Sequence, residues 1–398
     1  MEFHLEMIVK CLTNHKLQKY WKGFEAVSFA FYNKDNVYLY NHPKFKTVGY
    51  HPHLLPWSNE FSGDTIILYE DHPTAIVNLE LHEEFEDLYA ICVHELFHGY
   101  QFLMGDERYA DELLMITYPL SLENMELRIQ ERHHLYLSVM AATIEERNHA
   151  MYRFIAIRQQ REQLLGEYVL NEYLIETLEG PAWYVELNAY AEKSTLPNEG
   201  VLHKFSSYLI DELESSANIR RSCYGSGLFI CLLLDELRSD WKEEFMKSEL
   251  SLYAFFKQFV DQVIIPFEEI SISKETEDIM QSVKTIREKE FIDFISLDGY
   301  HLYIEGDIKS TGFNPMGIIG GDEKCIHKNN LRIQINDAEY FLEKPVISYY
   351  TADLRNINKL HLVLDEPPTF NKDSLILNGI GEIKGQYEVK EDGCWLQC

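Results

Sequence analysis

The pattern of apolar and polar residues changes twice along this chain of 398 residues. From Phe24 to about Leu81, short runs rich in aromatic and β-branched residues alternate with clusters of Asn, Asp, Pro and Gly, a pattern typical of strands joined by turns. Between about His82 and Lys284, apolar residues recur every three or four positions, which predicts helices. Beyond Phe291, short alternating runs return and predict strands again.

These changes predict an α+β protein with three parts. We expect residues 1–81 to form an N-terminal α/β part with a small sheet, and residues 82–285 to form a mainly helical domain. Residues 290–398 are expected to form a C-terminal β-sandwich or barrel of about 100 residues. The candidate chemistry described below lies in the helical region.

Charge and cysteine content narrow the possible partners and compartment. The chain has 36 Lys plus Arg against 65 Asp plus Glu, a formal charge of -29, which repels nucleic acid phosphates and anionic membrane surfaces. The apolar stretch from Leu228 to Leu234 is far shorter than the roughly 20 residues that span a bilayer. Seven cysteines without paired metal-ligand spacing favour reduced thiols. We expect a cytoplasmic protein that binds neither nucleic acid nor membranes, and the sequence leaves its oligomeric state open.

A metal-binding pattern lies in the apolar segment LYAICVHELFHGYQFLMG, where His94, Glu95 and His98 form the arrangement His-Glu-x-x-His. Residues four apart on a helix lie on one face, so the two imidazoles can bind one ion. Glu95 projects beside them, in a position that suits a general base rather than a ligand. This spacing predicts a zinc site.

The surroundings of this pattern favour burial. From Leu88 to Leu103 the only charged residue is Glu95, and charge resumes at Asp106. A buried helix with two histidines needs partners for them, and a metal ion is one such partner. The simpler alternative is a pair of core histidines satisfied by local hydrogen bonds.

A catalytic zinc site needs a third protein ligand. In the metzincin pattern a glycine and a third histidine would follow, but those positions hold Gln101 and Met104. The best later candidate is Glu179, which precedes Gly180 and Pro181. Proline is favoured in the first turn of a helix, so we expect Glu179 at a helix start. Other candidates remain open on chemistry alone: Glu176, Glu186, His133, His134 and His149.

The segment HELFH followed by LEGPAWYVE resembles the gluzincin metallopeptidases, a group that includes the aminopeptidase N and thermolysin-like catalytic domains. The aminopeptidase N branch pairs His-Glu-x-x-His with a later Asn-Glu-Gly-x-Ala-x-Tyr stretch. Residues Glu179, Gly180, Ala182, Tyr184 and Glu186 fall in register with this segment of the family. The resemblance covers roughly residues 60–240. It implies a zincin-like catalytic domain that holds one zinc ion per chain through His94, His98 and Glu179.

A second segment extends the resemblance. Tyr224 is followed by Gly227 and an apolar run, similar to the family segment in which a tyrosine hydroxyl stabilises the oxyanion, which implies a catalytic role for Tyr224. The chain differs from the aminopeptidase branch at Leu178, where the family has asparagine. It also has a longer gap between His98 and Glu179 and lacks an upstream Gly-x-Met-Glu-Asn segment. These differences indicate a divergent relative.

The sequence therefore predicts a zinc metallopeptidase that hydrolyses peptide or protein substrates, with Glu95 as general base and Tyr224 as oxyanion donor. Glu176 or Glu186 is expected to orient the histidines. One alternative is a catalytically inactive zincin-like protein that acts as a binding module. Another is a zinc hydrolase that acts on a non-peptide amide or an ester.

Three arginines precede the Glu179 segment and could bind a substrate carboxylate: Arg153, Arg158 and Arg161. Glutamates at nearby helical positions, Glu145, Glu146 and Glu162, favour ordinary ion pairs on the helix surface instead.

Overall fold

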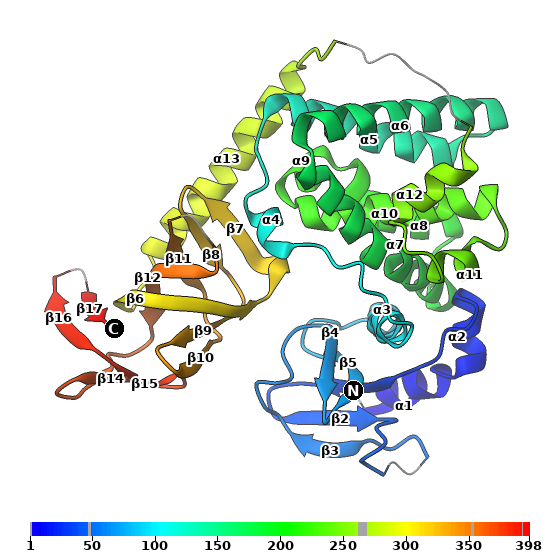
Figure 1. Cartoon of the computed structure of the whole chain (residues 1–398). Coiled ribbons are helices and arrows are strands. Elements are labelled where there is room, and N and C mark those ends of the chain that lie inside the picture. Colours follow the sequence, from blue (N-terminus) through cyan, green and yellow to red (C-terminus); the bar gives the residue numbers. More distant parts are fainter. Residues whose placement is uncertain (1, 47–48, 262–268, 352–353, 392) are drawn as a thin grey trace. The chain divides into compact units, whose positions relative to one another are not determined.

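The computed structural model describes residues 2–46, 49–261, 269–351, 354–391 and 393–398 (Figure 1). It divides into two compact units. The first contains residues 1–110 and 121–276, and the second contains residues 111–120 and 277–398. Each unit has buried hydrophobic clusters of its own. The candidate metal residues all belong to the first unit.

The N-terminal sheet of the first unit has the strand order β3-β2-β1-β5-β4. Its strands are β1 (Ser28–Tyr32), β2 (Asn36–Tyr40), β3 (His53–Pro56), β4 (Thr65–Tyr69) and β5 (His72–Asn78). β1 and β5 are parallel and the other pairs are antiparallel. All five side chains of β1 are buried, because both faces of the sheet are covered. Phe29 and Phe31 belong to the main core, and Ala30 and Tyr32 to a smaller cluster on the other face.

Helices make up most of the rest of the first unit. Their bounds are α1 (Glu2–Cys11), α2 (Asn14–Tyr20), α3 (Phe85–Leu103), α5 (Leu122–Met140), α6 (Ile144–Leu165), α7 (Glu167–Lys193), α8 (Asn198–Ile210), α9 (Glu212–Ala217), α10 (Ile219–Leu237), α11 (Trp241–Met246), α12 (Leu252–Phe256) and the 3₁₀ turn η1 (Lys257–Phe259). α3 packs against the sheet and against α7, and α7 packs against α10. α3 is buried on nearly every side, as its uninterrupted apolar sequence predicts.

The expectation that Glu179 stands at a helix start is wrong. Glu179 lies near the middle of the 27-residue helix α7, and Pro181 lies inside that helix. An interior proline lacks the N–H that would bond to the carbonyl four residues earlier and costs about 3 kcal/mol. The helix continues because the surrounding residues are buried on most of its faces, and tertiary packing overrides local propensity.

The second unit is mainly β structure. Its sheet has the order β10-β9-β6-β12-β11-β8-β7, with β17 paired to β6 and β16 paired to β17, and a separate small sheet has the order β13-β14-β15. β17 runs parallel to β6, and the other pairs are antiparallel. Residues of both sheets share one hydrophobic cluster, which includes Leu302 from β6 and Leu375 from β14.

The elements of the second unit are α4 (Glu112–Ile116), most of α13 (Lys274–Ile295), β6 (Tyr300–Phe313), η2 (Pro315–Gly317), β7 (Ile318–Gly321), β8 (Lys324–His327), β9 (Leu331–Ile335), β10 (Ala338–Leu342), β11 (Val346–Tyr350), β12 (Asn356–Leu364), β13 (Thr369–Phe370), β14 (Ser374–Leu377), β15 (Gly381–Lys384), β16 (Gln386–Lys390) and β17 (Gly393–Gln397). The α+β class and the order of sheet, helices and sheet along the chain are therefore confirmed. Among the described helices, none has the length and apolar character needed to cross a bilayer.

Candidate metal centre

Three donor atoms from two helices converge in the first unit. His94 and His98 stand four residues apart on α3, and Glu179 comes from α7, which packs beside it. The two imidazole Nε2 atoms are 3.0 Å apart. Oε2 of Glu179 lies 3.5 Å from Nε2 of His94 and 3.2 Å from Nε2 of His98. The three residues therefore form a compact triangle of nitrogen and oxygen donors.

The hydrogen bonds of Gln101 determine which ring nitrogen of His98 carries the proton. The Gln101 amide nitrogen donates to the Leu178 carbonyl over 2.9 Å, so its oxygen faces His98, whose Nδ1 lies 2.8 Å away. Because an amide oxygen can only accept, Nδ1 of His98 carries the proton. Nε2 is then left with a free lone pair that points toward Glu179.

His94 has a matching partner on the side away from the triangle. Its Nδ1 lies 2.7 Å from Oε2 of Glu186, which projects from α7. A carboxylate at this position favours the proton on Nδ1, as in the carboxylate–histidine–metal arrangements of many zinc proteins. The Nε2 atoms of both imidazoles and one carboxylate oxygen therefore face one another, and a cation at this position, either a proton on an imidazole or a metal ion, stabilises the arrangement.

The spacing of the donors fits zinc. Ligands held at about 2.0–2.1 Å in tetrahedral geometry are separated from one another by about 3.3 Å, and the three separations here are 3.0, 3.2 and 3.5 Å. Two nitrogens and one oxygen form a donor set that zinc accepts at catalytic sites. Oε2 of Glu179 is buried and has no hydrogen-bond partner, so a bound cation would satisfy it.

The electrostatics of the site also favour a positive charge. Burial lowers the pKa of His94, but the neighbouring carboxylates of Glu179 and Glu186 outweigh it and hold that pKa well above its ordinary value. Burial raises the pKa of Glu179, yet the nearby His98, Arg220 and His94 hold it well below the usual range. Glu179 is therefore ionised, and the protein around it stabilises a cation at the position between the donors.

Glu95 lies beside the donors but is not one of them. It is buried on α3, and one of its carboxylate oxygens has no hydrogen-bond partner. Burial raises the pKa of Glu95 to about 7, although the nearby charges of His94 and His98 oppose this shift. A carboxylate with a pKa near neutrality can both accept and release a proton at physiological pH.

Tyr224 and Arg220, one turn apart on α10, reach the same position. The Arg220 guanidinium donates to Oε1 of Glu179 over 3.1 Å and also to the Tyr224 hydroxyl. The Tyr224 hydroxyl in turn hydrogen-bonds Glu179, and its ring lies parallel to that of His94, with centroids 6.3 Å apart. The structure thus brings all five predicted site residues together: His94, Glu95, His98, Glu179 and Tyr224.

Of the two glutamates expected to orient the histidines, Glu186 contacts His94 and Glu176 does not lie in the donor group. Glu176 instead accepts hydrogen bonds from both terminal nitrogens of Arg158, each over 2.7 Å. It also accepts a hydrogen bond from the Ser226 hydroxyl of α10. Glu176 stands one helical turn before Glu179 on α7. It fixes that turn of the helix rather than a histidine ring.

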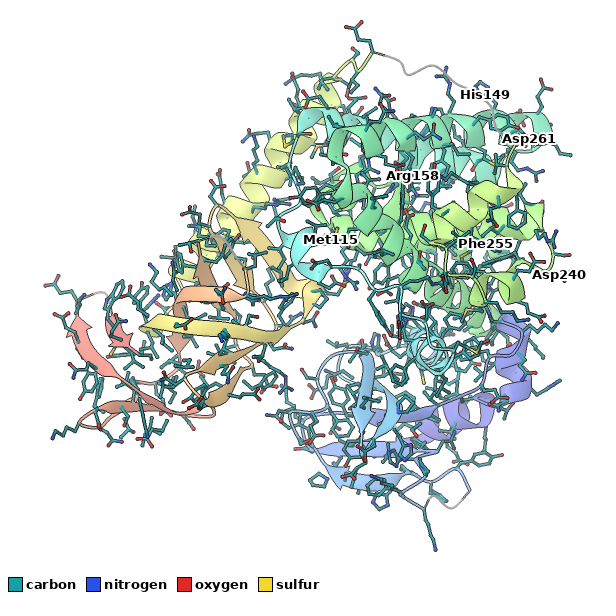
Figure 2. The ribbon with its side chains drawn as sticks, viewed as in Figure 1. Met115, His149, Arg158, Asp240, Phe255 and Asp261 are labelled. Atoms are coloured by element: carbon teal, nitrogen blue, oxygen red, sulfur yellow. The ribbon has the colours of Figure 1, made fainter. Side chains whose placement is uncertain are left out.

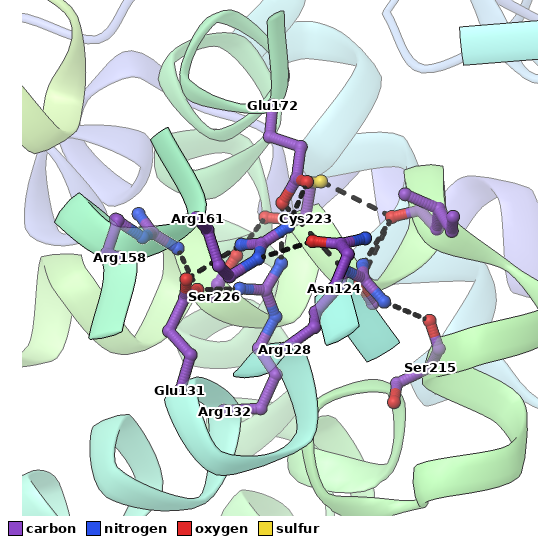
Figure 3. Close-up of polar contacts among 12 residues, drawn as sticks. Asn124, Arg128, Glu131, Arg132, Arg158, Arg161, Glu172, Ser215, Cys223 and Ser226 are labelled. Atoms are coloured by element: carbon purple, nitrogen blue, oxygen red, sulfur yellow. Dashed lines mark hydrogen bonds and ion pairs between the residues drawn. The ribbon is translucent and has the colours of Figure 1, made fainter. Parts of the chain in front are cut away.

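Arg158 belongs to a buried ion network that joins α5, α6, α7 and α10 (Figure 3). Arg158 and Arg161 each donate to Glu131 over 2.7 Å, and Arg132 donates to Glu172 over 3.1 Å. The network residues are Arg128, Glu131, Arg132, Arg158, Arg161, Glu172, Glu176 and Ser226, and all are buried.

The interpretation of Arg158 and Arg161 as helix-surface residues is therefore wrong. Both side chains are 0% exposed, and Figure 2 shows Arg158 among the helices of this unit. Their partners are Glu131, Glu172 and Glu176 from other helices, not the neighbouring glutamates of α6. The reason is physical: a buried guanidinium must be matched by carboxylates within the same core.

Gln101 and Arg220 are the site residues that sequence reasoning missed. Each acts through a partner distant in sequence: Leu178 for Gln101 and Glu179 for Arg220. A weak signal exists for Gln101, which is the only residue with a side-chain amide in the apolar segment from Leu88 to Gly105 that carries the histidines.

Comparison with models of known protein families, with curated proteins and with solved structures found no match. The function of the site must therefore be inferred from its own geometry and chemistry.

Proposed function

We propose that this protein is a zinc-dependent metallopeptidase of the gluzincin type, which holds one zinc ion through His94, His98 and Glu179. The observation that carries the proposal is the convergence of two imidazole nitrogens and one carboxylate oxygen within 3.5 Å of one another, with Glu95 beside them. Three protein ligands leave a fourth tetrahedral position for water, which distinguishes catalytic from structural zinc sites.

The side chains around the donors supply the remaining functions of a hydrolase. A bound zinc ion would lower the pKa of a water molecule toward neutrality and polarise the substrate carbonyl. The Glu95 carboxylate accepts a proton from the attacking water and passes it to the leaving amine nitrogen as the C–N bond breaks. The Tyr224 hydroxyl donates a hydrogen bond to the carbonyl oxygen as that atom gains negative charge.

Glu186 and Gln101 contribute by holding the histidine rings. The Gln101 oxygen accepts a hydrogen bond from Nδ1 of His98, and the Glu186 carboxylate faces Nδ1 of His94, so the Nε2 atom of each ring is directed at the proposed metal position. All seven cysteines are free, which suits the reducing cytoplasm, and we propose that compartment as the place of action. The proposed substrates are peptides or proteins.

The test combines metal analysis with turnover. Zinc content is measured on wild type, His98→Ala and Glu179→Ala, each prepared without added metal, and a peptide library is then screened with wild type and Glu95→Gln. We expect about one zinc per wild-type chain and much less in the two ligand variants. Glu95→Gln should keep its zinc and lose roughly 10²–10⁴-fold in activity.

The control is Glu199→Gln, an exposed glutamate on α8, which should retain both zinc and activity. Undiminished turnover in Glu95→Gln would exclude this mechanism. Wild-type protein that takes up no zinc even when zinc is resupplied would contradict the proposal, and would favour a catalytically inactive binding module instead.

A further inference from the structure

Arg220 occupies an unusual position for a cation. It lies in the first turn of α10 together with Arg221, and that turn contains no acidic residue. The positive end of the helix dipole lies there, so each cation is disfavoured by about 0.3–1 kcal/mol. The first turns of other long helices in this unit carry acids instead: Glu86 and Asp87 in α3, Glu123 in α5, and Glu145 and Glu146 in α6.

The contacts of Arg220 show what its placement achieves. One terminal nitrogen donates to Oε1 of Glu179 over 3.1 Å and the other to the Tyr224 hydroxyl. The Arg220 side chain is 15% exposed and that of Glu179 is 6% exposed, so this ion pair is screened little by solvent. Arg221, the next residue, is exposed and donates to the Tyr208 hydroxyl instead.

The two oxygens of Glu179 consequently have different roles. Oε1 is engaged by Arg220, while Oε2 is directed toward the two imidazoles. A carboxylate with both oxygens free can bind a metal through one or both of them, and bidentate binding would occupy the position that water needs. Because Arg220 engages Oε1, it leaves only Oε2 available to the ion.

We propose that Arg220 is a positioning residue that makes Glu179 a one-oxygen ligand and holds the Tyr224 hydroxyl beside the same position. The planar guanidinium is suited to this task because it can donate to two acceptors at a fixed separation, which a lysine ammonium cannot reproduce. This inference rests on the proposed zinc site.

Arg220 also affects the net charge around the donor atoms. Three carboxylates surround the metal position: Glu95, Glu179 and Glu186. The charge of Arg220 offsets part of this negative charge, and a bound zinc ion would offset more of it. Loss of Arg220 would remove a repulsion between two cations, but it would also leave Glu179 free to rotate.

The test compares Arg220→Met and Arg220→Lys with the matched control Arg221→Met. Zinc affinity is measured by competition with a chromophoric chelator, and ligand geometry by the visible absorption of the cobalt-substituted proteins, whose bands weaken as coordination number rises. We expect the lost orientation of Glu179 to outweigh the lost repulsion in Arg220→Met, so that zinc binds roughly 10–100-fold more weakly, with weaker cobalt bands. Arg220→Lys should fall between Arg220→Met and wild type, and Arg221→Met should match wild type in both measurements.

The outcomes separate this inference from the proposed function. Wild type that binds no zinc contradicts the proposed function itself. Wild type that binds zinc, with unchanged affinity and cobalt spectrum in Arg220→Met, overturns only the role of Arg220. Thermal melts of the metal-free variants report folding, and if Arg220→Met does not fold, wild-type affinity and spectrum in Arg220→Lys overturn the inference instead.

Discussion

Gly180 and Gly227 bring α7 and α10 into direct backbone contact: a Cβ placed on Gly180 would lie 2.7 Å from the Cα of Gly227. A Cβ placed on Gly227 would lie 2.9 Å from the carbonyl oxygen of Glu176. Neither helix can accept a side chain here without moving. Glu179 immediately precedes Gly180, and Tyr224 lies three residues before Gly227, so this contact sets the separation of the two sides of the candidate site.

We expect Gly227→Ala to push α10 away from α7. Overpacking of this kind costs about 1–3 kcal/mol, and the movement should also weaken zinc binding, because Arg220 and Tyr224 would withdraw from Glu179. Urea denaturation and zinc competition measure the two effects. The control is Gly200→Ala on α8, whose added methyl would make only ordinary contacts, the nearest at 3.6 Å from Pro197. Equal behaviour of the two variants would show that the helix contact does not set the site.

Glu186→Ala should weaken zinc binding by roughly 10–100-fold while the protein stays folded. The reason is that Glu186 lies 2.7 Å from Nδ1 of His94 and fixes the proton on that nitrogen. Zinc competition and a thermal melt of the metal-free protein check the two parts of this prediction. Glu199→Ala, at an exposed position on α8, should leave both unchanged, and a similar loss of affinity in that control would point to a general charge effect.

Acid should destabilise the buried ion network. Burial raises the pKa of Glu131, but the charges of Arg158, Arg161 and Arg132 outweigh it and hold the pKa at about 2. A carboxylate whose pKa is lower in the folded state stabilises the protein fully above its unfolded pKa of about 4.5. This contribution should be lost as the pH falls from about 4.5 toward 2. Urea denaturation at a series of pH values measures this loss.

Glu131→Gln tests the same network at neutral pH. Removal of the Glu131 charge leaves the buried guanidinium groups with only Glu172 and Glu176 as counter-charges, and breaking a buried ion pair in this way costs about 3–5 kcal/mol. The variant should also lose part of the acid dependence between pH 4.5 and 2, because it no longer has this carboxyl to protonate. Wild-type stability at pH 7 would contradict the importance of the network.

His327 of β8 should make the second unit sensitive to milder acid. It is buried, with Nε2 2.9 Å from the Ser348 hydroxyl, and burial lowers its pKa to about 4. The unfolded chain binds a proton near pH 6.5 and the folded one does not, so stability should fall by up to about 3 kcal/mol between pH 6.5 and 4 and then level off. In a His327→Gln variant, stability should depend less on pH between 6.5 and 4. The control His203→Asn changes an exposed histidine and should show the same pH dependence as wild type.

The helix that carries His94 and His98 could be predicted from sequence because its signal is local. Apolar residues on every side of α3 indicated burial, and the spacing of four residues placed both imidazoles on one face. Glu179 was identified by resemblance, but its setting was predicted wrongly, because Pro181 suggests a helix start when only the local chain is considered. Packing of α7 against α3 and α10 keeps the helix continuous through that proline.

Contacts between distant segments account for what the sequence did not reveal. Arg158 and Arg161 have glutamates nearby on their own helix, yet their partners come from α5 and α7. Gln101 acts through a carbonyl 77 residues away, and Arg220 through a carboxylate 41 residues away. No periodicity or spacing within one segment encodes such pairs, because they depend on which helices meet.

The separation of His98 and Glu179 along the chain gives the proposed metal site a consequence for unfolding. About 80 residues lie between these two residues, which belong to adjacent helices. An ion held by both would act as a crosslink that closes this long loop, and loop closure restricts the unfolded chain more as the loop lengthens. Chelation should therefore lower the resistance of the helical unit to unfolding, and refolding should acquire the ion only after α3 and α7 have docked.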